Sequence, residues 1–496
     1  MKNRIDRAES RSHHIFQKNF FNQTAMKINL SSVITLVFFA FTSAKAQEII
    51  TVQNGDTIEL DSVKQVYIYG LKGVNLTVSG TDSKELSYKV FIRANEDAML
   101  RNFGGGRLHN NLNAQALELF FKSTDSEGNS SSKGRTWIKD LFSGNTIQNQ
   151  IVKEARLEIS LPKALALKIN SRYSNLTISS IMGEVDVKNK SGSVKIEEAG
   201  SNVVIDNDYG DNDLSKINGN ITLNSRSANT EIKSVVGNVD INSNYSELRL
   251  TDIKGTVNVT NKSGGLRAEN IEGDIDFRGN YSKLIFKKID GMVNVENTSG
   301  SVEAEFIHGL RIKGSYTNIT ASDILETRLV TIDSKSAKVN LKRIAGPITI
   351  DGTYLEIDLE KIGGDVRIYT KSGSLNALDL QGNFTIDGEY NKVDVRGFSG
   401  KNFEAETRSG SIRAELEGIT EQVRIRNEHG SIDLKMNANA VKTGRLITNN
   451  GTISHSFDKS LIKREIKNET MHEIELAGTG SASVEIRCDS GSIDWK

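Results

Sequence analysis

A glycine recurs every 18 residues through the middle of this 496-residue chain, two places after an apolar residue each time. Between Gly219 and Gly309 the spacing does not change. The apolar residues and their glycines are Ile181 and Gly183, Ile217 and Gly219, Val235 and Gly237, Ile253 and Gly255, Ile271 and Gly273, Ile289 and Gly291, Ile307 and Gly309, Ile344 and Gly346, Ile362 and Gly364, Leu380 and Gly382, and Phe398 and Gly400. A fixed period of this length is typical of proteins whose units stack along one axis.

Each unit of 18 residues consists of two similar halves of nine. In the unit that begins at Gly183, Val185 and Val187 alternate with charged residues, and Val194 and Ile196 do the same in the second half. Apolar residues at every second position predict half-buried strands. Too few residues separate these runs for a helical crossover. The sequence therefore predicts an all-β fold, a β-solenoid of the parallel β-helix or β-roll type, and strand chirality favours a right-handed coil.

The corner opposite the Ile-x-Gly corner alternates between a small form and a large form. The small form carries Ser191, Ser227, Ser263, Ser299, Ser336, Ser372 and Ser409. The large form carries Tyr173, Tyr209, Tyr245, Tyr281, Tyr316, Tyr354 and Tyr390. The result is a super-repeat of 36 residues. A coil of 18 residues would alternate serine and tyrosine along one edge, whereas a coil of 36 would stack the tyrosines directly. The nine-residue halves favour 18.

Glycine and the few register changes fit this prediction. We expect the corner glycines to supply a positive φ or a close backbone approach. Tyr316 comes one place early and Tyr354 two places late, so loops or bulges between residues 310 and 346 are expected to absorb the difference.

The N-terminal segment has the features of an export signal. Residues 1–25 are polar and read as a non-native or disordered extension. Met26 then opens a predicted signal peptide over 26–46, with an apolar run and the sequence Ala44-Lys45-Ala46 at its end. We expect cleavage after Ala46; the alternative is an uncleaved N-terminal anchor. Nothing later is apolar enough to span a membrane, so an exported protein of the periplasm or cell surface is expected.

The remaining chain divides into a central repeat and two ends. A solenoid needs caps over its terminal strands. Residues 47–170 are predicted to form an N-terminal β-rich cap with a polar loop at 122–150, residues 171–436 the repeat, and residues 437–496 a C-terminal cap with the last coil. Within that cap, residues 460–475 fit a short helix or a hairpin arm. The single cysteine, Cys488, forms no internal disulfide and is expected to be buried.

Charge and motifs exclude several functions. Lys plus Arg and Asp plus Glu both number 63, which argues against general nucleic-acid binding. The acidic residues Asp206, Asp208, Asp211 and Asp213 have no acidic counterparts in other coils, so neither a carboxylate-based catalytic groove nor a calcium β-roll is favoured, although one calcium ion at this turn stays an alternative. The histidines show no ligand spacing. We therefore predict no catalytic residue, no cofactor and no metal.

The tyrosines admit two interpretations. As structure, the rings cover the edge of the core and turn their hydroxyls to water. As function, an exposed row of aromatic rings binds a glycan or a partner protein, because a ring with an apolar body and a polar tip suits recognition. For the second interpretation the candidate residues are Tyr209, Tyr245, Tyr281 and Tyr390.

The alternating strands with Ser-Gly corners, and the segment EISLPKALALKINSRYSNLTI that leads into the first tyrosine corner, resemble the bacterial putative-adhesin family of domains of unknown function. The resemblance covers about Gln47–Lys496 and implies an exported β-solenoid of the Bacteroidetes type. The family has no catalytic motif to transfer, and the tyrosine corners depart from its commoner Ser-Gly pattern.

These observations together predict a function. We expect an exported, adhesin-like β-solenoid that acts without catalysis as a binding or structural protein of the cell envelope, with a glycan or an envelope protein as partner. The alternatives are a polysaccharide-active lyase or hydrolase and a structural envelope component without a ligand.

Overall fold

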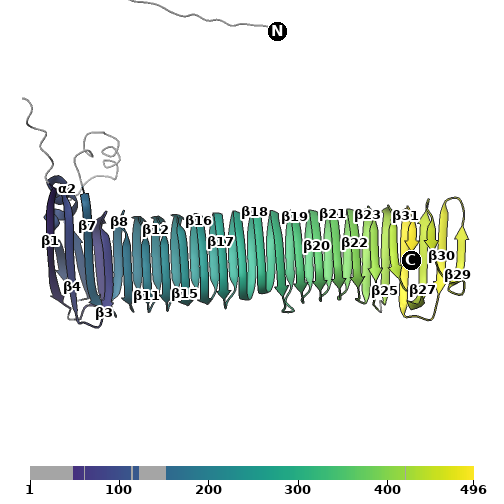
Figure 1. Cartoon of the computed structure of the whole chain (residues 1–496), viewed down its shortest axis with the longest axis horizontal. Helices are drawn as coiled ribbons and strands as arrows, with labels where there is room; N and C mark the ends of the chain where they lie inside the picture. The colour runs from purple at the N-terminus through teal and green to yellow at the C-terminus, as the bar shows by residue number, and fades with distance from the viewer. Residues whose placement is uncertain (1–48, 61, 113–114, 122–151, 419–420) are drawn as a thin grey trace, which may run out of the picture. The chain divides into compact units, whose positions relative to one another are not determined.

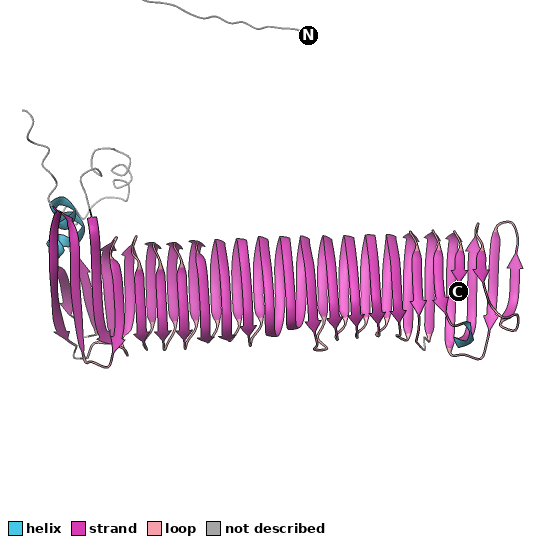
Figure 2. Ribbon diagram, viewed as in Figure 1, coloured by secondary structure: helices cyan, strands magenta, loops and turns pink. Residues whose placement is uncertain are grey.

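The computed structural model of the chain describes residues 49–60, 62–112, 115–121, 152–418 and 421–496. The predicted extension 1–25, the signal peptide 26–46 with its cleavage after Ala46, and the polar loop 122–150 lie outside these residues. Ile49–Lys496 forms a compact unit by itself. In this unit, strands stand side by side along one axis (Figure 1), and almost all of the described elements are strands (Figure 2).

The elements fall into three groups. The N-terminal group is β1 (Ile49–Glu59), β2 (Gln65–Lys72), β3 (Asn75–Thr81), β4 (Glu85–Asn95), α2 (Glu96–Phe103), the 3-10 turn η1 (Gly104–Gly106), β5 (Leu108–Leu112), β6 (Ala116–Phe121) and β7 (Val152–Pro162). The repeat is β8 (Ala166–Arg172), β9 (Leu176–Ile181), β10 (Val185–Ser191), β11 (Val194–Ala199), β12 (Val203–Tyr209), β13 (Asn212–Ile217), β14 (Ile221–Ser227), β15 (Asn229–Val236), β16 (Val239–Lys254), β17 (Val257–Ile271), β18 (Ile275–Ile324), β19 (Val330–Ile344), β20 (Ile348–Ile362), β21 (Val366–Leu380), β22 (Phe384–Phe398), β23 (Asn402–Ser409), β24 (Ile412–Leu416), β25 (Gln422–His429) and β26 (Ile432–Met436). The C-terminal group is η3 (Ala438–Ala440), β27 (Val441–Asn449), β28 (Ile453–His455), β29 (Ile462–Lys467), β30 (Met471–Ala477), β31 (Ala482–Ser490) and β32 (Ile493–Trp495).

Strand pairing sets the length of one coil. β10 pairs in parallel with β12, and Val185 lies opposite Val203. β11 pairs in parallel with β13, and Val194 lies opposite Asn212. Both offsets are 18 residues, and about 15 turns follow one another. The predicted β-solenoid with an 18-residue coil is confirmed, and the 36-residue coil is wrong because neighbouring strands are one unit apart.

One register change occurs where the sequence predicts it, and two others lie beyond the predicted interval, where the offset is 19 between β22 and β23 and 20 between β23 and β25. Between β18 and β19 the offset rises to 20, so that Leu310 lies opposite Val330 and Ile319 opposite Val339. The additional residues form the loop 325–329 at one corner. Strands on both sides of this loop keep their pairing, because the insertion lies outside the ladder.

The N-terminal end combines parallel and antiparallel pairing. β2 and β3 form the first coil: β2 pairs in parallel with β8, and β3 with β9. Beyond β3, the sheet continues through β7 and then through β4 and β1, which pair antiparallel. Beyond β2, the other sheet continues through β6 and β5. Strands of changed direction therefore cover this end of the repeat.

At the C-terminal end, the last strands of the chain are inserted into the stack. β31 pairs in parallel with β25 on one side and with β27 on the other (Figure 1). β32 lies between β26 and β28 in the same way. The antiparallel strands β30 and β29 continue the sheet from β27. Of the two alternatives for residues 460–475, the hairpin arm is therefore confirmed.

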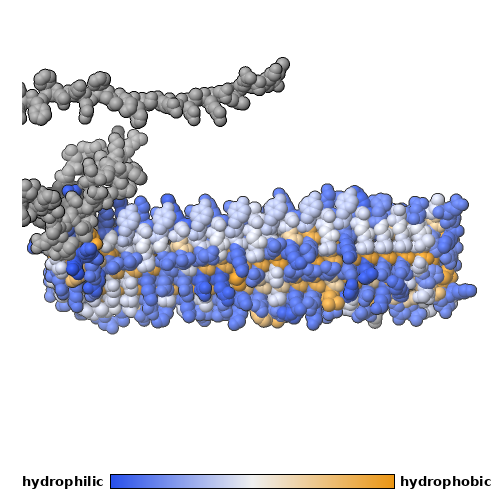
Figure 3. All heavy atoms as spheres, turned by 45° about the horizontal axis from the view of Figure 1, so that its top comes forward, coloured by the Kyte–Doolittle hydropathy of each residue, from blue (hydrophilic) through white to orange (hydrophobic). Residues whose placement is uncertain are grey.

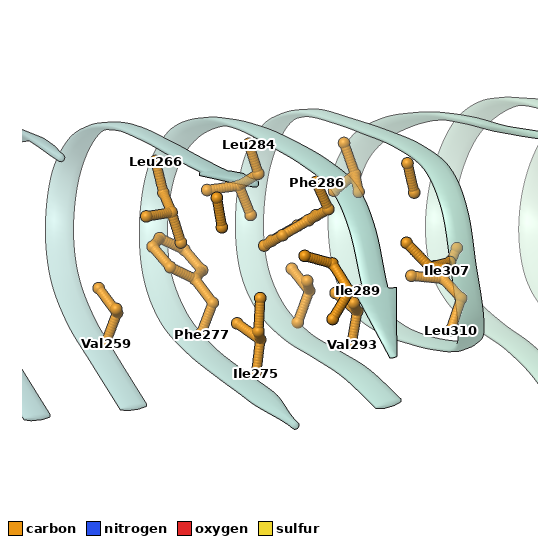
Figure 4. Packing of buried hydrophobic residues seen from close by; sticks show 14 of the residues in the cluster. Val259, Leu266, Ile275, Phe277, Leu284, Phe286, Ile289, Val293, Ile307 and Leu310 are labelled. Atoms are coloured by element: carbon orange, nitrogen blue, oxygen red, sulfur yellow. The ribbon is translucent and has the colours of Figure 1, made fainter. Parts of the chain in front are cut away.

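The core is a continuous file of apolar side chains between the two sheets (Figure 4). Phe277 lies opposite the smaller Val259 in the preceding coil, and Phe286 lies opposite Ala268. All four are at most 2% exposed. Large side chains over small ones fill the interior at high density. Ile289 of the Ile-x-Gly corner is also buried, so this corner closes the core.

The two corners use glycine differently. At the serine corner, Gly192 has a φ of 111°, and a Cβ there would collide with the Ser174 carbonyl of the preceding coil. At the Ile-x-Gly corner, a Cβ on Gly273 would likewise collide with the carbonyl of Gly255 in the preceding coil. The left-handed residue of this corner, however, precedes the apolar residue and is usually not glycine. These left-handed residues are Ser180, Glu198, Lys216, Ser234, Asp252, Asn270, Lys288, Phe306, Asp323, Arg343, Lys361 and Asp379. Each such conformation costs about 1–2 kcal/mol, so the packed corner must offset it.

Buried asparagines support the serine and tyrosine corners from inside. The side-chain amide of Asn261 donates to the Ser246 carbonyl at 2.8 Å, and that of Asn297 donates to the Ser282 carbonyl at 3.1 Å. Both asparagines are at most 1% exposed. They provide hydrogen bonds to carbonyls that the turn removes from the strand ladder.

Candidate recognition edge

The seven corner tyrosines form one row along the solenoid, here called the tyrosine row. Its members are Tyr173, Tyr209, Tyr245, Tyr281, Tyr316, Tyr354 and Tyr390. Their exposed fractions lie between 45% and 68%, so about half or more of each side chain faces solvent. The rings therefore cover the core edge only in part, and each leaves an aromatic surface open for contact.

Tyrosine and serine alternate along this row, as the sequence predicts. Tyr245 lies opposite Ser263, and Ser263 lies opposite Tyr281. Farther along the repeat, Tyr354 and Tyr390 flank Ser372 in the same way. Since neighbouring strands are about 4.8 Å apart, successive rings lie about 10 Å apart with one hydroxyl between them. The rings therefore stand singly and do not stack on one another.

A shallow polar groove of about 810 Å³ runs beside the N-terminal half of the row. Its floor includes one column of outward side chains: Lys188, Asp206, Asn224 and Asn242 lie opposite one another on successive coils. Figure 3 shows a face covered mostly by hydrophilic residues, with an interrupted hydrophobic line along its length. The groove offers hydrogen-bond donors and acceptors of both charges.

Arg226 links this groove to the row. Its Nε lies 3.2 Å from an Asp208 carboxylate oxygen. The pKa of the Arg226 guanidinium is raised, first by its hydrogen bond to Tyr209 and second by the negative charge of Asp208. A fixed cation is thus held beside an exposed ring.

A second groove of about 590 Å³ continues the same column toward the C-terminus. Asp351, Tyr369, Asp387, Glu406 and Arg426 follow one another in it, each on the next coil. This groove is more strongly charged than the first. Toward the C-terminus, the surface beside the row therefore changes from a mixture of amide and charged side chains to mainly charged side chains.

The four aspartates considered as a catalytic or calcium site are engaged in contacts between coils. Asn224 donates to Asp206 at 2.8 Å, and the backbone N–H of Asn229 donates to Asp211 at 3.1 Å. Asp208 pairs with Arg226, and Asp213 lies 3.6 Å from Lys195 Nζ. Within the described ranges, no group of three or more His, Cys, Asp or Glu side chains is placed to hold a metal ion.

Cys488 is buried in β31, as expected. Its thiol lies 3.2 Å from the Gly430 carbonyl, and burial raises the pKa of the thiol. A raised pKa keeps the group in its less reactive protonated form. Among the described residues, no helix is long and apolar enough to cross a membrane.

The family model of Toastrack DUF4097 matches residues 90–308 and 303–495, which is most of the chain. The chain belongs to the Toastrack DUF4097 family. This match confirms the predicted membership of a family of domains of unknown function. No curated protein matches this Toastrack chain.

Three crystal structures are similar to this Toastrack protein at low identity. A putative cell adhesion protein from Clostridium sporogenes ATCC 15579 shares 9% identity over 90% of this chain and 99% of its own, with a TM-score of 0.14. A putative adhesin from Parabacteroides distasonis ATCC 8503 shares 13% over 72% and 97%, with a TM-score of 0.16. A putative adhesin from Parabacteroides merdae ATCC 43184 shares 12% over 71% and 96%, with a TM-score of 0.13.

The row of this Toastrack protein has one further member that the sequence analysis missed. Tyr390 lies opposite Ser409, Ser409 lies opposite His429, and His429 lies opposite Ser490. His429 is exposed and takes the next large position. The signal was present: Asn427-Glu-His-Gly repeats the frame of Asn207-Asp-Tyr-Gly, but a search for tyrosine alone does not find it.

Proposed function

We propose that this protein is an exported, non-enzymatic, adhesin-like binding protein of the cell envelope, and that the tyrosine row is its recognition surface. One observation carries the proposal: rings of one residue type stand about half or more exposed on alternate coils of a rigid repeat. A small residue is sufficient for folding at such a corner, since serine occupies the intervening ones. The exposed rings therefore need another explanation, and contact with a partner supplies it.

The repeat suits binding that sums many weak contacts. Each ring offers a modest contact, and a partner that spans several coils meets several rings at once. Once one ring is engaged, the next meets its partner at a high effective concentration, which raises the overall affinity. The solenoid holds the rings at fixed spacing, so little conformational entropy is lost on binding.

The enzyme alternative needs uncommitted carboxylates clustered in a groove. Asp206, Asp208, Asp211 and Asp213 instead have partners on neighbouring coils, which favours a stabilising role for them. Binding without catalysis therefore accounts for the repeated surface with fewer additional assumptions. The predicted signal peptide supports export, with the periplasm and the cell surface as the two locations.

A binding assay on cells tests the proposal. Fluorescently labelled protein that begins at Gln47, which contains the compact unit Ile49–Lys496, is incubated with bacterial envelopes, epithelial cells and a glycan array. A variant with Tyr209→Ser, Tyr245→Ser and Tyr281→Ser is expected to lose most of the binding while its β circular-dichroism signal persists.

The matched control is Phe306→Ser. Phe306 is an aromatic residue that is 49% exposed, against 45% for Tyr209, but it lies at the Ile-x-Gly corner, opposite the tyrosine row. This variant should bind like the wild type. Equal binding by the triple variant and the wild type, or no binding by either to any surface, would contradict the proposal and favour a structural role for the rings.

A further inference from the structure

The spacing of the rings restricts which partner could contact several of them. Tyr209, Tyr245 and Tyr281 lie two coils apart, with Ser227 and Ser263 at the corners between them. The resulting repeat is about 10 Å along the solenoid axis. A partner that touches successive rings must present the same apolar face once per repeat and something smaller in between.

An extended β-1,4-linked pyranose chain has this property. Each sugar in such a chain is turned over relative to its predecessor, so that alternate sugars present the same C–H face. One disaccharide advances by slightly more than two coils of the solenoid, and the sugar C–H face stacks on aromatic rings. An α-1,4-linked chain coils instead and a β-1,3-linked chain forms a wide helix, so neither places alternate faces in one line.

The polar groups around the rings match the hydroxyls of sugars. Ser263 and Lys262 lie between Tyr245 and Tyr281, and Asn244 and Asn280 each precede a tyrosine. Serine hydroxyls and asparagine amides both donate and accept hydrogen bonds, as sugar hydroxyls require. The groove beside this part of the row is lined by asparagine amides together with five basic and two acidic side chains. The amides supply donors and acceptors for sugar hydroxyls.

We propose that the segment from Tyr209 to Tyr281 binds an extended β-1,4-linked polysaccharide laid along the solenoid axis, with every second sugar stacked on a tyrosine. This inference rests on the proposed function of the tyrosine row and adds the class of ligand. Since a disaccharide is slightly longer than two coils, the match holds over a few rings and is lost over the entire row. A hexasaccharide spans the matched segment.

Isothermal titration with hexasaccharides tests the ligand class. Chitohexaose and cellohexaose are the β-1,4-linked probes, and maltohexaose and laminarihexaose are the α-1,4- and β-1,3-linked controls. The protein begins at Gln47. We expect binding of at least one β-1,4-linked probe, weaker binding of its tetrasaccharide and no binding of the two controls. Tyr245→Ser should weaken binding about fivefold or more, because an aromatic contact contributes about 1 kcal/mol or more.

A rearranged variant tests the spacing. Tyr245→Ser combined with Ser263→Tyr keeps the number of tyrosines but moves the middle ring by one coil, directly beside Tyr281. Its affinity should fall as far as that of Tyr245→Ser, whereas Phe306→Ser, at the opposite corner, should leave affinity unchanged. Tyr281→Ser provides an independent variant if a substitution at Tyr245 disturbs the fold.

The outcomes separate this inference from the proposed function. Wild-type affinity in the rearranged variant would overturn the inference, since spacing would then be irrelevant. Binding to cells or to other glycans that depends on the tyrosines, without binding of either β-1,4-linked probe, would overturn the inference and leave the proposed function standing. Failure of the tyrosine variants to change any binding would overturn both.

Discussion

Asn261 illustrates how single residues stabilise the corners of this solenoid. Its side chain is fully buried and donates to the Ser246 carbonyl at 2.8 Å, a contact between neighbouring coils. Asn261→Ala leaves this buried carbonyl without a donor, which costs about 1–3 kcal/mol. We therefore expect the free energy of unfolding, measured by urea denaturation, to fall by about this amount.

Asn258→Ala is the matched control for this residue. Asn258 also donates to a neighbouring coil, to Asp240 at 2.8 Å, but it is exposed. Water replaces an exposed partner, so the loss should stay within about 0.5 kcal/mol. Equal losses in the two variants would show that burial of the corner asparagine has no particular importance.

At the scale of elements, the inserted strand β31 decides the stability of the C-terminal end. β27 has its parallel partner only when β31 lies beside it, and β31 also pairs with β25. Truncation after Gly480 removes β31 and β32 and leaves residues 437–480 without this ladder. Since each lost hydrogen bond contributes about 1 kcal/mol, limited proteolysis should cleave this segment at least about tenfold faster.

The surface substitution Arg487→Ser in β31 is the control, because its side chain is exposed and the ladder stays intact. Cleavage within the repeat, for example in β10–β24, should change little after the truncation, since each coil contacts mainly its neighbours. A segment 437–480 that keeps wild-type protection without β31 would mean that the hairpin β29–β30 and β27 are stable alone.

Local patterns explain which elements the sequence predicts and which it does not. Alternation such as Val185 and Val187 identifies strands, and the 18-residue period identifies their neighbours, because both effects are local or strictly repeated. The insertion of β31 between β25 and β27 is neither local nor repeated. Val484 in β31 alternates like any other strand residue, so the sequence does not show which strands β31 pairs with. The left-handed residues that precede the apolar corner residue could not be predicted, because they belong to many residue types; Lys288 and Phe306 are two examples.

The candidate site divides in the same way. The tyrosine row follows from the period of 36 residues alone, and the structure adds that its rings are exposed. His429 escaped because it has the position of a tyrosine without its identity. The groove beside the row also escaped, because Lys188 and Asp206 form one column only after the coils stack.

At the scale of the whole molecule, the alternation of corners separates folding from recognition. Deletion of residues 239–256 removes one coil, and deletion of residues 239–274 removes two. Both variants lose Tyr245 and keep the other six tyrosines. In the first, two serine corners separate Tyr209 from Tyr281; in the second, only Ser227 separates them, which restores the natural spacing.

Both deletions should fold, because the repeat is stabilised by contacts between neighbouring coils and each variant closes on an equivalent strand. We expect the two-coil deletion to bind its ligand like the wild type. The one-coil deletion should bind at least about fivefold more weakly, because one aromatic contact of about 1 kcal/mol or more is out of register. Binding measured on the same glycan array decides this. Equal affinities in two variants with equal numbers of tyrosines would mean that the spacing of the row serves packing and not recognition.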